Sequence, residues 1–294
     1  MIDLHTHSAV SDGTDTPAEL VATAAAAGVT TLALTDHDTT AGWAEAVGAL
    51  PAGTTLVRGA EFSTESPDGR GGTVTAHLLG YLFDPTHREI VAEQERLRAE
   101  RRERVREIGA RLAADGYPVD GDALLARIPA GSAAGRPHIG QALVAAGVVA
   151  SVGEAFDRLL HKNSPYYVPK RDTPIADAVA MVRAAGGVPV FAHPFARRRG
   201  PVVEPSVIVD LVDRGLAGIE VDHPDHGAED RETLRALAAR HGLVATGSSD
   251  YHGTNKTTPI AAETTAPAAL DALVAQATGS PLVTGGTQEI TGGH

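Results

Sequence analysis

The sequence predicts an α/β fold, with one sheet whose strands alternate with helices over much of the chain. The first observation is a set of seven short apolar runs, at residues 2–4, 31–34, 55–57, 74–79, 188–191, 218–221 and 243–246. The second is that each run ends in, or contains, histidine or acidic residues. Parallel strands bring their C-terminal ends to one rim, where α/β enzymes hold their sites. The chain therefore predicts a polynuclear metal site at the mouth of a barrel.

Composition narrows the class of protein. With 294 residues, 43% of them hydrophobic, the chain is long enough for one large α/β domain plus an insertion. It has no cysteine, which excludes disulfides and thiolate zinc sites and leaves imidazole and carboxylate as metal ligands. The net charge of −12 argues against long nucleic acid or an anionic membrane as a partner. Because a strand is predicted from residue 2 and no apolar run is long enough to span a bilayer, we expect a cytoplasmic protein.

The elements follow in order. Thr16-Pro17-Ala18-Glu19 has the pattern of a helix start, and that helix ends at Gly28 before the next strand. A second helix is predicted at about 40–50, so the strands around it should be parallel. After residue 84 the strand signals stop, and a long charged helix is predicted from about 88 to 115.

This gap in the strand pattern predicts the domain organisation. We expect residues 84–172 to form an all-helical insertion that closes over the barrel mouth, and 1–83 with 173–294 to form the barrel. Strand and helix signals return after residue 174 and continue to about 277. For the Gly- and Thr-rich tail, 279–294, a last short strand and partial disorder both remain open.

Histidines and carboxylates at the strand ends are the candidate metal ligands. His5 and His7 are two residues apart, so in a strand they point to the same side and can hold one ion. Asp250 and His252 repeat this spacing. Glu61 has two oxygens and can bridge two cations. The remaining candidates are single residues near strand ends or within a strand: Asp12, His37, His77 and His193.

Other readings of these residues stay open. Asp12 precedes Gly13 and suits a turn, and His77 lies among apolar residues, as a buried core histidine would. Asp38 or Thr39 is expected to cap the helix that follows.

The strand-end motifs together resemble the polymerase and histidinol phosphatase (PHP) family of metal-dependent phosphoesterases. The resemblance spans about 250 residues and keeps the family's order of motifs. The segments that carry it are Asp3-Leu4-His5-Thr6-His7-Ser8, Ser11-Asp12-Gly13, Thr35-Asp36-His37-Asp38, Gly59-Ala60-Glu61-Phe62-Ser63, Ala192-His193-Pro194 and Ser249-Asp250-Tyr251-His252-Gly253. It implies a distorted seven-stranded β/α barrel that holds three divalent ions.

The resemblance also implies which residues hold each ion. The first ion is assigned to His5, His7, Glu61 and Asp250. The second is assigned to Asp12, His37 and His252. The third shares Glu61 and adds His77 and His193. Manganese is our first choice of metal, with zinc or iron as alternatives that imidazole and carboxylate ligands also suit.

A second resemblance concerns the insertion. Gly135-Arg136-Pro137-His138-Ile139, Ala155-Phe156 and Tyr166-Tyr167-Val168-Pro169 are similar to the subgroup that removes the 3′-phosphate of nucleoside 3′,5′-bisphosphates. It implies that Arg136 and His138 bind the second phosphate, with Lys170 or Arg171 assisting. The alternative is structural, since Pro137 suits a helix start and 164–171 suits a solvated loop.

Three further features have a functional and a structural interpretation. His223 follows a strand and could protonate the leaving group or only pack behind the site. The triplet Arg197-Arg198-Arg199 could contact phosphate or RNA, or form a solvated loop. The Arg- and Glu-rich segment 88–107 is expected to be a solvated helix with i, i+4 pairs. Five histidines are expected at the surface: His87, His161, His226, His241 and His294.

These inferences favour a phosphoric monoester hydrolase. A hydroxide bridging the first and second metals would attack phosphorus in line, so Asp250 and His252 count with His223 as catalytic. A 5′→3′ exonuclease that trims short oligonucleotides is the related alternative. A third possibility is a non-catalytic metal-binding PHP module that serves a partner protein. The complete set of candidate ligands disfavours this module, and the insertion disfavours histidinol phosphate as the substrate.

Overall fold

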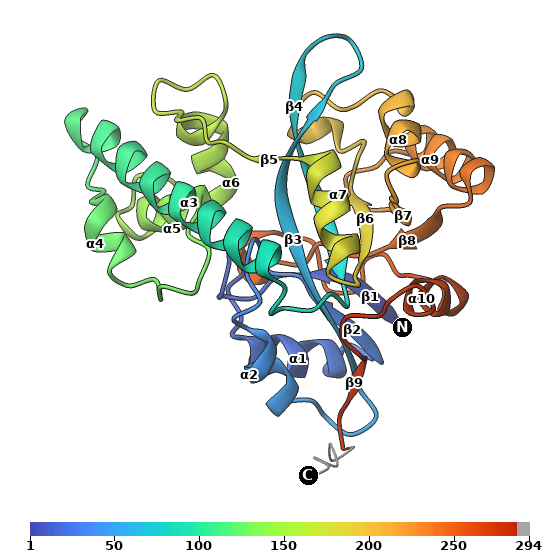
Figure 1. Ribbon diagram of the computed structural model, residues 1–294. Coiled ribbons are helices and arrows are strands. Elements are labelled where there is room, and N and C mark those ends of the chain that lie inside the picture. Colours follow the sequence, from blue (N-terminus) through green and yellow to red (C-terminus); the bar gives the residue numbers. More distant parts are fainter. Residues whose placement is uncertain (287–294) are drawn as a thin grey trace.

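The computed structural model describes residues 1–286, so the predicted surface residue His294 lies outside the described part. Its sheet forms a nearly closed barrel of seven strands in the order β1-β2-β3-β4-β6-β7-β8 (Figure 1). These strands are β1 (Ile2–Thr6), β2 (Thr31–Leu34), β3 (Thr55–Pro67), β4 (Thr73–Tyr81), β6 (Val188–Ala192), β7 (Gly218–Asp222) and β8 (Val244–Gly247). The segment after β8 returns to β1, where the His7 N–H donates to Tyr251 O at 2.9 Å. The predicted seven-stranded barrel is confirmed.

One strand runs against the expected direction. β4 is antiparallel to both β3 and β6, whereas the remaining neighbours in the barrel are parallel. The prediction that all seven strand ends meet as C-terminal ends was therefore wrong for β4. The reason is local, because a short turn at 68–72 joins β3 directly to β4 without a crossover helix. Asp68 accepts hydrogen bonds from the Arg70 and Gly72 N–H groups in this turn, and Gly69 and Gly71 have positive φ angles.

Side chains alternate between the two faces of each barrel strand. Leu32, Leu56 and Phe191 pack with residues of the surrounding helices. Ala33, Val57 and Val190, their neighbours in sequence, belong to a separate cluster on the inner face. The helices around the barrel are α1 (Pro17–Ala26), α2 (Trp43–Gly48), α7 (Ile175–Ala184), α8 (Pro205–Val212), α9 (Ala228–His241) and α10 (Pro267–Val274). The predicted start of α1 is confirmed, with reciprocal Thr16 and Glu19 hydrogen bonds.

The chain between β4 and the short strand β5 (Thr173–Pro174) contains only helices and loops. Its helices are α3 (Arg88–Ala114), α4 (Gly121–Leu125), α5 (Arg136–Ala145), α6 (Val152–Ala155) and η1 (Phe156–Leu160), and they lie to one side of the barrel (Figure 1). They share a hydrophobic core of their own, formed by residues between Val105 and Val168. No helix among residues 1–286 is long and apolar enough to cross a membrane.

The remaining short elements bear on the tail and on the basic segments. The last described strand, β9 (Val283–Thr284), pairs with β3, as the first of the two readings of the tail predicted. The elements η2 (Arg197–Arg199) and η3 (Gly253–Asn255) are single turns beside the barrel mouth. The expected solvated character of 88–107 was wrong in part. Arg102 donates to Leu125 O at 3.0 Å, and Arg104 donates to Val168 O at 2.7 Å, so these side chains hold the insertion together.

Candidate metal centre

The candidate ligands gather at the barrel mouth, most of them after strand ends, but Glu61 and His77 from the middle of the long strands β3 and β4. His5 is in β1, Glu61 is in β3 and His77 is in β4, while the others follow directly after strands or lie in loops. Three residues at these ends have positive φ angles although they are not glycine: Asp38 (52°), His193 (28°) and Asp250 (51°). Such backbone conformations cost energy and are concentrated at functional sites. The local strain thus marks the same rim that the sequence motifs mark.

Glu61 lies at the centre of the cluster and is almost fully buried. Its Oε2 atom is 3.2 Å from His5 Nε2, 3.1 Å from His7 Nε2 and 3.2 Å from His37 Nδ1. Its Oε1 atom is 2.7 Å from His77 Nδ1 and 3.0 Å from His193 Nε2. The two carboxylate oxygens therefore face two different sets of imidazoles. This is the arrangement that a bridging carboxylate requires.

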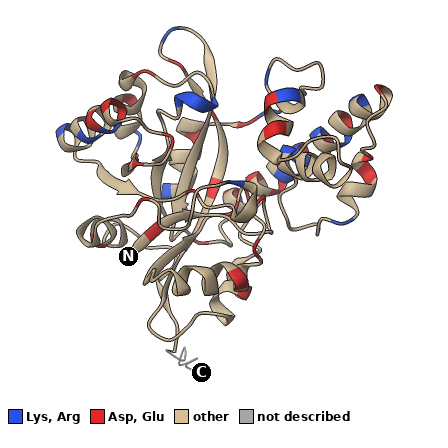
Figure 2. Ribbon diagram, turned by 180° about the vertical axis from the view of Figure 1, so that it is seen from behind, with Lys and Arg blue, Asp and Glu red and all other residues tan. Residues whose placement is uncertain are grey.

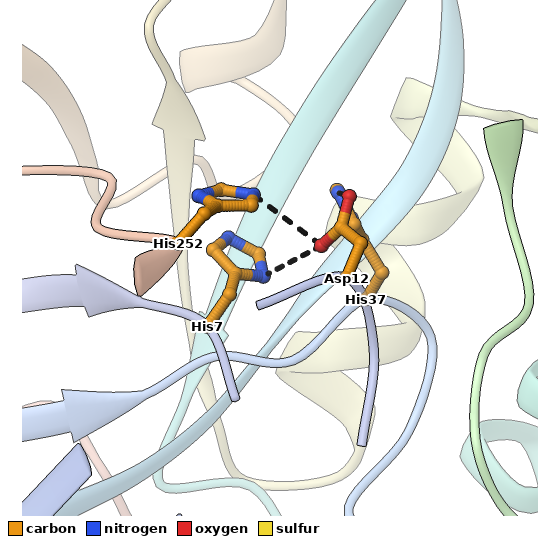
Figure 3. A group of neighbouring side chains, drawn as sticks. All are labelled: His7, Asp12, His37 and His252. Atoms are coloured by element: carbon orange, nitrogen blue, oxygen red, sulfur yellow. Dashed lines mark ion pairs between the residues drawn. The ribbon is translucent and has the colours of Figure 1, made fainter. Parts of the chain in front are cut away.

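A second group surrounds Asp12 (Figure 3). Asp12 Oδ1 is 3.3 Å from His252 Nε2 and 3.7 Å from His7 Nδ1, and Asp12 Oδ2 is 3.7 Å from His37 Nε2. His7, Asp12, His37 and His252 each offer one ligand atom, and these atoms lie within 4.8 Å of one another. The same holds for His5, His7 and Glu61, and for His37, Glu61 and His77.

The donor atoms suit metal ions better than hydrogen bonds. His5 Nε2 and His7 Nε2 lie 3.1 Å apart, and two ring nitrogens of neutral imidazoles can share at most one proton. His37 Nδ1 is buried without a hydrogen-bond partner among residues 1–286. Burial and nearby imidazoles lower the pKa of His7 well below its usual range, and burial lowers the pKa of His37 to about 4. Both imidazoles are therefore neutral at pH 7, the form that binds metal.

Electrostatics at His5 point the same way. Burial alone would lower the pKa of His5, but the carboxylates of Glu61, Asp250 and Glu220 raise it well above its usual range. The carboxylates around His5 therefore favour a positive charge at this point. A divalent cation supplies that charge when it replaces the proton.

A layer of buried carboxylates orients the ligands, and sequence reasoning did not assign it this role. Glu220 Oε1 is 3.2 Å from His5 Nδ1 and accepts from Ser248, while Oε2 accepts the His193 N–H at 2.8 Å. Asp36 accepts from Ser8 N–H at 2.8 Å and from the Ser11 hydroxyl. Partners of this kind fix the orientation of ligating side chains. The signal was available, because an acidic residue inside an apolar strand run, such as Glu220, must have buried partners.

Asp38 also differs from its predicted role. Neither Asp38 nor Thr39 caps α2, whose N-cap residue is Gly42. Asp38 is fully buried and accepts from the backbone and hydroxyl of Ser63 and from Arg101. The expectation of a helix cap was wrong because the carboxylate turns toward β3 and the insertion.

A cavity of about 670 Å³ lies between the metal cluster and the insertion. Candidate ligands line one side of it: Asp12, His37, Glu61, His77, Asp250 and His252. Lysine and arginine side chains also line it: Arg101, Arg104, Arg136, Lys162, Lys170, Arg199 and Lys256. Figure 2 shows how many lysines and arginines the insertion helices carry, although the chain as a whole is acidic.

Two of the four predicted phosphate contacts line this cavity. Arg136 lies 5.1 Å from the Phe156 ring centre and 5.8 Å from that of Tyr167, and donates to Leu160 O at 2.8 Å. Lys170 pairs with Asp172. Burial, together with Arg101, lowers the pKa of Lys170 well below its usual range.

The other two predicted contacts lie outside the cavity lining. His138 Nδ1 accepts the Gly135 N–H at 3.1 Å at the start of α5. Arg171 is 88% exposed and lies 3.3 Å from Glu100 Oε1. The role of these two side chains in binding phosphate stays a prediction.

His223 and Arg199 lie on the other side of the cluster. The Asp225 N–H donates to His223 Nδ1 at 3.0 Å, so in the neutral ring the proton is on Nε2, 3.4 Å from Asp250 Oδ2. Of the basic triplet, Arg199 reaches the cluster and contacts Asp250 Oδ2 at 2.5 Å and Asp225 Oδ2 at 2.7 Å. Arg197 instead pairs with Asp230 at 3.0 Å.

One predicted surface histidine is buried. His226 is only 5% exposed, and its Nδ1 donates to Val221 O at 2.9 Å while Nε2 accepts the Phe195 N–H. The prediction for His226 was wrong because it faces the barrel loops and satisfies their backbone groups.

Comparisons with known proteins agree with this fold and site. Residues 3–115 match the PHP domain family. The chain is 36% identical over 252 residues to a 3′,5′-nucleoside bisphosphate phosphatase of Chromobacterium violaceum, covering 85% of this chain and 87% of that protein. A 5′-3′ exoribonuclease of Haemophilus influenzae is also 36% identical, over 85% and 89% of the two chains. A phosphoribosyl 1,2-cyclic phosphate 1,2-diphosphodiesterase of Eggerthella lenta shows 36% identity over 85% and 94%.

A solved structure has the same fold. A Bifidobacterium adolescentis protein, itself predicted to be a metal-dependent phosphoesterase, superposes with a TM-score of 0.86 and 35% identity over 94% of this chain and 96% of that one. The chain belongs to the PHP family. Its similar relatives act on phosphate esters, but their names specify three different substrates.

Proposed function

We propose that this chain is a metal-dependent phosphoesterase that removes the 3′-phosphate of nucleoside 3′,5′-bisphosphates. The observation that carries the proposal is the shared cavity, which has candidate metal ligands on one side and a group of cations on the other. A substrate with two phosphates can place one at each side. The relative named as a 3′,5′-nucleoside bisphosphate phosphatase supports this choice.

The proposed metal sites follow the division of Glu61 between two sets of imidazoles. One ion would be held by His5, His7, Glu61 and Asp250, a second by Asp12, His37 and His252, and a third by Glu61, His77 and His193. Manganese is our first choice. Divalent ions at these positions would stabilise the charge on the reacting phosphate and activate water for attack.

The cations of the insertion bind the phosphate that is not cleaved. Arg104, Arg136 and Lys170 are partly buried near one another. After burial, Arg104 lowers the pKa of Arg136, and both arginines lower the pKa of Lys170. Positive charges at such short distances repel one another, and an anion bound among them offsets this repulsion. Residues 84–172 are therefore proposed to act as a cap that recognises the second phosphate.

His223 is proposed to hold a proton for the leaving oxygen. Its Nε2 atom is buried and has no hydrogen-bond partner within the described chain. Because the Asp225 N–H occupies Nδ1, a proton on Nε2 faces the cluster and is available to the 3′-oxygen as the P–O bond breaks.

A second candidate function is 5′→3′ exonuclease activity on short oligonucleotides. A further cavity of about 730 Å³ meets the site at Asp250 and is lined by hydroxyl and amide groups, among them Thr254 and Asn255. It lies where a phosphate carrying another nucleoside would need space. Release of a nucleoside 5′-phosphate breaks the same 3′ P–O bond in both reactions.

The test is a substrate panel on manganese-loaded protein. It contains adenosine 3′,5′-bisphosphate, AMP, histidinol phosphate and a short 5′-phosphorylated RNA. We expect phosphate release from the bisphosphate, and AMP to be a poor substrate because one phosphate cannot contact both sides of the cavity. Phosphate release only from histidinol phosphate would refute the substrate assignment. Efficient trimming of the RNA with a slow reaction on the bisphosphate would favour the second candidate.

A further inference from the structure

Asp38 connects three of the candidate ligands. It follows His37 directly, and its own N–H donates to Glu61 O at 3.1 Å. Its carboxylate accepts the Ser63 N–H at 2.7 Å and the Ser63 hydroxyl at 2.7 Å. Ser63 is the cross-strand partner of His77 in the β3–β4 pair. His37, Glu61 and His77 are one of the groups whose ligand atoms converge within 4.8 Å.

The insertion contacts this same carboxylate. Arg101 of α3 donates from Nε to Asp38 Oδ2 at 2.6 Å and from Nη2 to the Ser63 hydroxyl at 2.7 Å. Arg98, one turn earlier, donates to Asp38 O at 2.9 Å. The Arg101 side chain is only 11% exposed, and Asp38 is fully buried. Arg101 therefore makes two buried hydrogen bonds, one to the Asp38 carboxylate and one to the Ser63 hydroxyl. Together they fix the positions of these side chains more firmly than an exposed ion pair would.

Asp38 also has a backbone conformation that needs support. Its φ angle is 52°, which is unfavourable for a residue with a Cβ atom. The bonds to Ser63 and Arg101 hold the residue in this conformation, and the turn it makes directs the preceding His37 toward Glu61.

We propose that Arg101, Asp38 and Ser63 form a positioning hub through which the insertion sets the affinity of the two proposed metal sites that use His37 and His77. This inference rests on the proposed metal function. Helix α3 would then position metal ligands through Arg101, in addition to lining the substrate cavity. None of the three hub residues is assigned as a ligand.

The direction in which manganese affinity changes when Arg101 is removed distinguishes positioning from charge repulsion. Arg101 is close enough to His37 to contribute, after burial, to the lowered pKa of that imidazole. If charge were the only effect, removing this guanidinium would strengthen the binding of a cation nearby. Loss of positioning predicts the opposite, weaker binding, because partners behind ligating side chains typically contribute 10- to 100-fold in metal affinity.

The experiment measures manganese binding to chelator-treated protein by titration calorimetry and by elemental analysis after dialysis. The variants are Arg101→Met, Arg101→Lys and Ser63→Ala. The matched control is Arg102→Met, since Arg102 lies next in α3 but donates to Leu125 O and Ile128 O within the insertion. Thermal unfolding of each metal-free variant shows whether it is folded.

We expect Arg101→Met to bind manganese about 10- to 100-fold more weakly at the two sites that use His37 and His77, with the remaining site less affected. Arg101→Lys and Ser63→Ala should weaken binding at the same two sites to a smaller extent, although both variants keep the positive charge at position 101. Arg102→Met should bind manganese like the unaltered protein. Unchanged or tighter binding in Arg101→Met, or an equal loss in Arg102→Met, would overturn the hub. The number of ions in the unaltered protein separately tests the proposed ligand assignment.

Discussion

Glu61 shows how much of the site depends on one side chain. Its two oxygens lie within 3.2 Å of the ring nitrogens of five histidines: His5, His7, His37, His77 and His193. The surrounding imidazoles outweigh burial and lower the pKa of Glu61 well below its usual range. The carboxylate therefore stays charged and can face two cations at once.

Replacement of Glu61 by Gln should consequently remove more metal and more activity than replacement of His77 by Gln. The first change alters both proposed ions that share the carboxylate, and the second alters one. Elemental analysis after desalting and kcat/KM on adenosine 3′,5′-bisphosphate measure the two effects. An equal loss in both variants would contradict the bridging role.

Arg136 should distinguish substrates with two phosphates from those with one. A charge-assisted hydrogen bond contributes roughly 1.5–3 kcal/mol, or about 10- to 150-fold in kcat/KM. We expect Arg136→Ala to reduce kcat/KM on adenosine 3′,5′-bisphosphate by this factor and to leave an aryl phosphate nearly unaffected. Metal content should not change. A similar loss on both substrates would mean that Arg136 supports the reacting phosphate or the fold.

At this scale the sequence predicted the residues that converge, because strand ends place histidines and acids on a common rim. It did not predict their supports. Asp38 looked like a helix cap, and Arg101 looked like one of many arginines on a solvated helix. Their contact joins residues 63 positions apart, and no local pattern encodes such a pair.

Among the elements, the β3–β4 pair explains why the barrel is distorted. β3 has 13 residues, and its second half pairs with β4 beyond the short parallel strands. His77 reaches the cluster from within β4 because that strand runs in the reverse direction. The sequence contained the signal, since Pro67-Asp68-Gly69 and Gly71-Gly72 between two strand runs are typical of a hairpin. The alternation of strands and helices elsewhere in the chain had instead suggested that all seven strands are parallel.

The insertion should depend on its own core for stability. Leu112 in α3 is fully buried in the insertion cluster, while Val91 near the start of the same helix is 38% exposed. Leu112→Ala should lower the free energy of unfolding by about 2–5 kcal/mol, and Val91→Ala should have little effect. Urea denaturation monitored by circular dichroism measures both. Equal effects would mean that Leu112 does not lie in a packed core.

The whole molecule combines an acidic chain with a cationic cavity. The formal charge is −12, yet seven lysine and arginine side chains line the space between the metal cluster and the insertion. Cations of the insertion, together with divalent ions at the proposed metal sites, suit a small polyanion better than a long nucleic acid. The sequence predicted the fold, but the cavity is formed jointly by residues of the barrel and of the insertion, and no local pattern predicts it.

Metal removal should destabilise the protein as a whole. Ions that bind only the folded state stabilise it, by about 2.7 kcal/mol for each site when the free ion is at 100 times its Kd. Chelator-treated protein should therefore unfold at a lower temperature, and the midpoint should rise with added manganese. Unfolding followed at several manganese concentrations measures this effect. A midpoint that is independent of manganese and of chelator would contradict a metal centre in the folded state.

The most direct test of the central claim is the reaction of manganese-loaded protein with adenosine 3′,5′-bisphosphate in ¹⁸O-labelled water. The products are identified by mass spectrometry. Attack of water on the 3′ phosphorus predicts unlabelled adenosine 5′-phosphate and one ¹⁸O atom in the inorganic phosphate, with no reaction in the presence of a chelator. Adenosine 3′-phosphate as the product, label in the nucleotide, or the same rate with a chelator would contradict the account.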